Sequence, residues 1–210
     1  MSSFSPAVQR YLNSCRTNNI QGVRAYLTTI HCNPHWAYRG VQYCVENESI
    51  TALRLICDYK TKTGIDHDED WIRLSTEAVR RMLGNNPSGS SSKEIFSMLL
   101  QTNPQPDLNA VARSVGDCTN VALLEVALPY LSTEQKTTVF ERVCKNRNSA
   151  ECVERMLSEV NVEIVWPKIA DSWDKPGEDN TTIVENFLLN KRLMSEIQVE
   201  DTISVSRRKM

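Results

Sequence analysis

The sequence has no long hydrophobic run and no marked excess of charge of one sign. Its 24 Lys and Arg residues against 26 Asp and Glu residues give a formal net charge of -2. A protein that neutralises a nucleic-acid backbone needs a basic excess or a basic stripe, and the only basic run is Arg207-Arg208-Lys209, in a terminal stretch expected to be solvated. The longest apolar runs are far shorter than a membrane span. These absences predict a protein that binds neither nucleic acid nor membrane.

Cys-x-x-Cys pairs are also absent, although the chain has seven cysteines. An odd number of cysteines, placed mostly in the apolar stripes of expected helices, is typical of reduced core residues in a cytosolic protein. Residues 1–9 contain neither the charged nor the apolar segment of a secretory signal. We therefore expect a cytoplasmic protein that is a monomer in isolation. If the protein is exported by another route, the expected location is a host cytosol.

What the sequence does contain is a helix-turn-helix pattern that recurs about five times. Residues 41–53 align without a gap with residues 111–123, an offset of 70 that corresponds to two repeats of 35. Each copy carries Asn or Asp in its turn, and these turn residues lie 29 to 38 residues apart: Asn18, Asn47, Asn85, Asp117 and Asn146. Periods near 30 to 35 indicate stacked helical hairpins, none of which buries its apolar stripe without neighbours.

The apolar spacing predicts the helices of each hairpin. The first hairpin begins near Ser5-Pro6 and ends at Asn33-Pro34. The later hairpins pair residues 36–45 with 50–59, 71–83 with 93–101, 108–115 with 119–130, and 133–145 with 149–160. Polar segments at 60–70 and 84–92 are expected to project from the stack. A divergent sixth hairpin with a helix over 181–194 is expected to close a single domain, residues 1–194, before a tail at 195–210.

The best-preserved unit is Cys44-Val45-Glu46-Asn47 followed by Ala52-Leu53-Arg54-Leu55-Ile56. It resembles the helix-turn-helix half of an ankyrin repeat, which has a small residue or Cys late in the first helix, a polar turn, and Val/Leu-x-x-Leu/Ile in the second helix. The likeness covers roughly residues 8–160, and the repeats are degenerate because none carries Thr-Pro-Leu-His. The resemblance implies an all-α solenoid of five to six stacked ankyrin-like hairpins. It also implies a protein-interaction module that binds a partner protein on its concave and loop surface.

Four aromatic residues lie at or near the beginning of expected first helices, next to the loops between repeats: Trp36, Tyr38, Tyr43 and Trp71. In ankyrin-like solenoids this face binds partners, and aromatic side chains are favoured as interface anchors. We therefore expect these four residues to contact the partner. The alternative is that Trp36 and Trp71 join one hairpin to the next inside the core.

Two segments have residue types that can bind metals. His31 and His35 lie near Cys44 and Cys57 of adjacent units, but Pro34 interrupts the helix that would bring the two histidines to one face. The acidic run at residues 66–70 lacks the glycine and the distal Glu of a calcium-binding loop, and it suits the positive end of the helix expected to follow. We expect no metal and no cofactor.

Catalytic motifs are missing: the sequence has no Gly-x-Ser-x-Gly, no phosphate-binding loop and no His-Glu-x-x-His. The cysteines belong to repeat stripes, where burial keeps a thiol inert. We expect no catalytic residue and no enzymatic activity. Two alternatives stay open: a pathogen or viral effector that sequesters a host protein through the same surface, and an enzyme with a Cys nucleophile or a metal on a helical scaffold.

Overall fold

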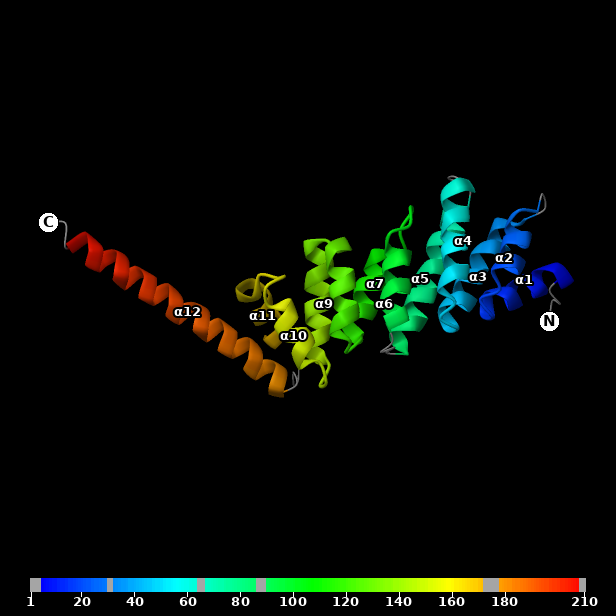
Figure 1. The fold of residues 1–210 in the computed structure, drawn as a ribbon. Coiled ribbons are helices and arrows are strands. Elements are labelled where there is room, and N and C mark those ends of the chain that lie inside the picture. The colour runs from blue at the N-terminus through cyan, green and yellow to red at the C-terminus, as the bar shows by residue number, and fades with distance from the viewer. Residues whose placement is uncertain (1–4, 30–31, 64–66, 86–89, 172–177, 208–210) are drawn as a thin grey trace.

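The computed structural model describes residues 5–29, 32–63, 67–85, 90–171 and 178–207. Every regular element in these ranges is helical, which confirms the expected all-α class (Figure 1). The first helices of the five units are α1 (Pro6–Arg16), α3 (Pro34–Glu46), α5 (Asp68–Gly84), α7 (Leu108–Asp117) and α9 (Thr133–Lys145). The second helices are α2 (Ile20–Leu27), α4 (Ile50–Thr63), α6 (Ser90–Leu100), α8 (Val121–Ala127), which continues as η1 (Leu128–Tyr130), and α10 (Ala150–Met156). The chain continues with α11 (Val162–Asp171) and α12 (Glu178–Arg207).

The helices of the five units form two rows. In one row α3 packs against α1 and α5, and α7 packs against α5 and α9; we call this row the first-helix layer. In the other row α4 packs against α2 and α6, and α8 packs against α6 and α10; we call it the second-helix layer. Figure 1 shows the helix pairs following one another in chain order. Each helix therefore buries its apolar stripe against its own partner and against the neighbouring units.

Polar side chains cap the helix starts in several units. Asn19, Asn33, Asp107 and Asn120 each accept hydrogen bonds from backbone N–H groups of the first helical turn. At α9 the predicted start is confirmed, because Ser132 and Gln135 form a reciprocal capping box. Local chemistry at these positions sets the unit boundaries.

The predicted turn residues lie at the ends of the first helices, and two of them also connect neighbouring units. Asn18 adopts a left-handed backbone with φ 52°, and its side-chain oxygen accepts a hydrogen bond from the Ala52 N–H of the next unit at 3.0 Å. The side chain of Asn146 donates to the Asp117 carbonyl of the preceding unit at 3.2 Å. These hydrogen bonds hold adjacent turns at a defined separation.

The connection predicted at 60–70 is shorter than expected, because α4 runs to Thr63 and α5 begins at Asp68. Lys60 is buried and its ammonium donates to the Asp68 carboxylate at 2.5 Å, so part of this polar segment is packed rather than projecting. In the second predicted insertion, residues 86–89 lie outside the described residues.

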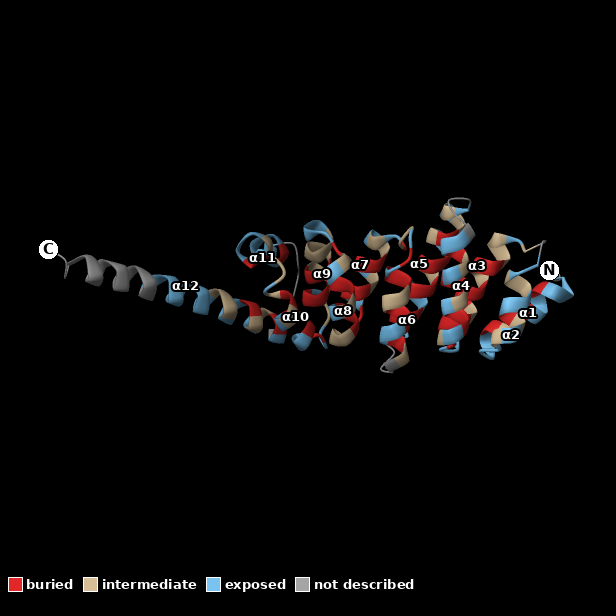
Figure 2. Cartoon of the chain, turned by 45° about the horizontal axis from the view of Figure 1, so that its top comes forward, coloured by how far each residue is buried: buried red, intermediate tan, exposed pale blue. Residues whose placement is uncertain are grey.

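The last helix differs most from the expectation. The helix expected to end at Met194 continues to Arg207, so residues 195–207 are helical instead of a tail. At its start, the buried Asn180 amide donates to the carbonyls of Cys144 and Asn146, at 3.1 and 2.8 Å, and so attaches α12 to the end of α9. Figure 2 shows α12 then leaving the body, where Leu189 is 54% exposed.

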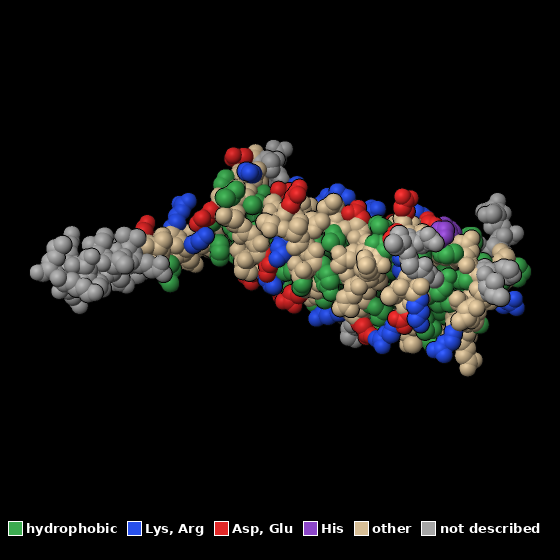
Figure 3. Space-filling model, turned by 90° about the horizontal axis from the view of Figure 1, so that it is seen from above, with side chains coloured by type: hydrophobic (Ala, Val, Ile, Leu, Met, Phe, Trp, Pro, Cys, Tyr) green, Lys and Arg blue, Asp and Glu red, His purple; other side chains and the backbone are tan. Residues whose placement is uncertain are grey.

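A single hydrophobic core extends through the described residues from Val8 to Val184. Six of the seven cysteines are buried and Cys32 is half-buried. In Figure 3 hydrophobic side chains lie between two edges that carry Lys, Arg, Asp and Glu side chains of both signs. Over the described ranges, no helix is both long enough and apolar enough to cross a membrane.

Candidate partner-binding surface

Two of the four aromatic residues expected at the interface lie inside the core. Tyr38 and Trp71 are fully buried, and their rings meet edge to face with centroids 5.1 Å apart. The Trp71 indole N–H donates to the Thr102 hydroxyl at 3.2 Å and to the Pro104 carbonyl at 3.0 Å. A partner cannot reach these rings, so the expectation is corrected for both residues. They join α3 to α5 and the third unit to the loop that follows α6.

Trp36 and Tyr43 are partly exposed on α3. Trp36 packs against the core, and its ring meets the imidazole of His35 edge-on at 5.1 Å. Tyr43 lies at the rim of a groove, and the Arg16 guanidinium carbon is 4.6 Å from its ring centroid. Among the four predicted residues, these two remain within reach of a partner.

The groove next to Tyr43, which we call the α1–α3 groove, has a volume of about 560 Å³. Its charged lining residues are Arg10 and Arg16, both exposed, and no carboxylate from the described part of the chain lines it. The rest of its lining comes from Pro6, Gln9, Leu12, Asn13 and Tyr43.

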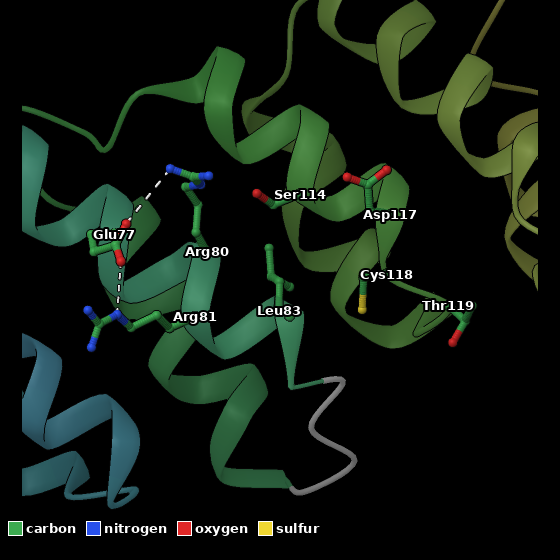
Figure 4. A pocket seen from close by; sticks show the side chains of 9 residues that line it. Glu77, Arg80, Arg81, Leu83, Ser114, Asp117, Cys118 and Thr119 are labelled. Carbon is green, nitrogen blue, oxygen red and sulfur yellow. Dashed lines mark hydrogen bonds and ion pairs between the residues drawn. The ribbon is translucent and has the colours of Figure 1, made fainter.

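A second groove, the α5 groove, lies over α5 between α3 and α7 and has a volume of about 660 Å³. An adjoining pocket of about 390 Å³ lies between the ends of α5 and α7 and shares Glu77 and Arg80 with it (Figure 4). Both signs of charge line the α5 groove: Glu69, Glu77 and Asp107 against Arg73, Arg80 and Arg113.

Ion pairs neutralise several of the charges at the α5 groove. Arg73 pairs with Asp70 at 2.7 Å, and Arg81 pairs with both Glu77 and Glu46 at 2.9 Å, so Arg81 connects α5 to α3. The hydrogen bond from Arg73, together with the one from His35, holds the pKa of the Asp70 carboxyl below its usual range. Arg113 is exposed and forms no ion pair with any described residue.

The sequence alone did not identify Arg73, Arg80 and Arg113 as candidate binding residues. Arg73, Glu77 and Arg80 follow one another at helical spacing, a pattern that any solvated helix face also has. The groove exists only because α7 packs beside α5 and leaves a hollow above it. The sequence around Glu77, Arg80 and Arg81 has no feature that distinguishes a binding surface from an ordinary solvent-exposed helix face.

The suspected metal ligands do not converge where they are described. His31 and Asp66 lie outside the described residues. His35 faces the Asp70 carboxylate at 3.3 Å, and Asp68 pairs with Lys60. Among the residues that the structure describes, no group of three His, Cys, Asp or Glu side chains is close enough to hold a metal ion.

The buried thiols have little nucleophilic character. Burial raises the pKa of Cys57 and of Cys144 to about 12, and that of Cys152 to about 11. Because the thiolate is the nucleophilic form, these side chains are protonated and poorly reactive at neutral pH.

Comparison with known proteins identified no similar protein. No protein-family model, no curated protein and no solved structure matches the chain.

Proposed function

We propose that the chain is a protein-interaction module, a solenoid of ankyrin-like hairpins that binds a partner protein on its first-helix layer without performing catalysis. The observation that carries the proposal is the pair of grooves on this layer, the α1–α3 groove and the α5 groove, both bordered by α3. The order of packing supports the solenoid, since each unit contacts its neighbours in sequence around a continuous core.

The lining residues suit partner recognition. Tyr and Arg are enriched among the residues that dominate binding energy, and both occur at the α1–α3 groove. The alternating charges of the α5 groove favour selection of a partner with a complementary pattern. None of the seven cysteines, which all lie in the described ranges, forms a disulfide, and this supports a cytoplasmic setting for the interaction.

The test is capture of a partner by the purified chain from cytosolic lysate, identified by mass spectrometry. We expect a stoichiometric partner that is lost in the variant Arg80→Glu/Arg113→Glu, because both side chains line the α5 groove and are exposed. The matched control is Arg24→Glu/Lys93→Glu, which makes the same change of charge at exposed positions of α2 and α6 in the second-helix layer.

All variants are first compared with wild type by circular dichroism and thermal unfolding. Equal loss of the partner in both double variants would reject the first-helix layer as the binding surface. Failure to recover any stoichiometric partner with the wild type, from several lysates, would contradict the interaction module itself.

A further inference from the structure

We propose that the α1–α3 groove binds an acidic peptide segment of the partner, held in an extended conformation with two carboxylates on Arg10 and Arg16. The inference rests on the proposed function, because it names the partner chemistry for one groove of the first-helix layer. It starts from the lining of that groove, in which the only charged side chains of the described residues are two exposed guanidinium groups.

The two arginines differ from several others on the same layer because no described carboxylate pairs with them. Among the described residues neither Arg10 nor Arg16 forms an ion pair, whereas arginines of α5 and α9 pair with carboxylates at 2.7 to 2.9 Å: Arg73, Arg81 and Arg142. Unpaired cations on one wall of a hollow attract an anionic partner and speed its encounter.

Arg16 is held in a geometry that suits a carboxylate. Its guanidinium carbon lies 4.6 Å from the Tyr43 ring centroid, a cation–π arrangement. A guanidinium that lies over an aromatic ring still has N–H groups that can donate in its own plane to the two oxygens of a carboxylate. The ring therefore limits the rotamers of Arg16 and reduces the entropy lost on binding.

The spacing on α1 selects how the two carboxylates are arranged. Arg10 and Arg16 are six residues apart on α1, which is roughly 9 Å along the helix axis at the α-helical rise. A peptide extended as a polyproline II helix advances roughly 3.1 Å per residue with three residues per turn, so side chains at i and i+3 lie on the same face roughly 9 Å apart. Two acidic residues at i and i+3 of an extended segment match the two arginines.

Two amide side chains beside the arginines favour a peptide over a free anion. Gln9 and Asn13 line the same groove, and their side-chain amides can donate to backbone carbonyls and accept from backbone N–H groups. A phosphate ion has no N–H groups to offer to these acceptors. An extended main chain between two carboxylates uses both the charged and the amide residues.

The experiment is fluorescence anisotropy with the full chain and a labelled Ser/Gly peptide that carries Glu at i and i+3. We expect binding that weakens when NaCl is raised from about 50 to about 300 mM, because the contacts are exposed ion pairs. The same peptide with Gln in place of both Glu residues is expected to bind roughly tenfold more weakly, and the protein variant Arg10→Gln/Arg16→Gln to lose a similar factor. Arg24→Gln/Lys93→Gln is the matched control and is expected to bind as wild type does.

Three results would overturn the inference. They are equal affinity for the Glu and Gln peptides, unchanged affinity in Arg10→Gln/Arg16→Gln, and displacement of the peptide by millimolar sodium phosphate at constant ionic strength, which would assign the groove to free anions. Partner capture separates this failure from failure of the proposed function. If Arg10→Gln/Arg16→Gln still captures the wild-type partner, the acidic-segment inference falls while the interaction module stands.

Discussion

At the scale of residues, Trp71 shows how an aromatic side chain expected on the surface becomes a connection within the core. It is fully buried, contacts Tyr38 of the preceding unit, and donates to Thr102 and Pro104 after the second helix of its own unit. A side chain with these contacts stabilises the junction of two units and presents nothing to a partner. Trp36 has a different place, because it is only partly buried.

We predict that Trp71→Ala lowers the free energy of unfolding by about 3–5 kcal/mol, since it removes a large buried ring and leaves a cavity. Trp71→Phe retains most of the volume but leaves the Thr102 hydroxyl and the Pro104 carbonyl without this donor, and we expect a loss of about 1–3 kcal/mol. Urea denaturation followed by circular dichroism measures both. Trp36→Ala is the matched comparison, and an equal loss in Trp36→Ala and Trp71→Ala would contradict the difference in burial.

At the scale of elements, the distance between the first helices α7 and α9 depends on a glycine. A Cβ added at Gly116 of α7 would lie 2.6 Å from the Arg142 Cβ and 3.1 Å from the Val139 carbonyl oxygen, both on α9. Gly84 has the corresponding position near the end of α5, and a Cβ there meets nothing within 4 Å. The close approach of α7 to α9 therefore requires a residue without a side chain at position 116. The end of α5 has room for a side chain at position 84.

Gly116→Ala is accordingly expected to cost about 1–3 kcal/mol of stability, because α7 and α9 must move apart. Gly84→Ala is its control, with an expected change of less than about 1 kcal/mol, in the stabilising direction that Ala favours in a helix. Thermal and urea unfolding of the two variants measure both changes in stability. Destabilisation of Gly84→Ala as large as that of Gly116→Ala would mean that contact with α9 is not the cause.

At the scale of the whole molecule, the stacked units share one core, and buried thiols are distributed along it. Cys15, Cys44, Cys118 and Cys144 lie in four different units and are all buried, whereas Cys32 is half-buried before α3. Stability of such a stack is the sum of the units and of the interfaces between them. The thiols therefore report opening of the stack along its length.

We predict that a thiol reagent at neutral pH labels the native protein slowly at every cysteine except Cys32, and labels all seven cysteines in urea. The pKa values of about 12 at Cys57 and Cys144 mean that raising the pH from 7 to 9 leaves these groups protonated, so their labelling in the native state stays slow. Mass spectrometry of digested samples identifies the labelled residues. Rapid native labelling of a buried cysteine would favour the enzyme with a Cys nucleophile over the interaction module.

The sequence by itself determined the helical class, the five pairs of helices and the turn residues between them. These depend on local physics: apolar periodicity, side-chain caps such as Ser132, and the left-handed backbone that Asn18 accepts. Only the tertiary structure decided that Tyr38 and Trp71 are buried, that α12 continues to Arg207, and that Arg10 and Arg16 line the groove beside Tyr43 without an ion pair to any described residue. Periodicity orients a side chain relative to its own helix, but its burial and its partners depend on which neighbouring helix packs against that face, and at what distance.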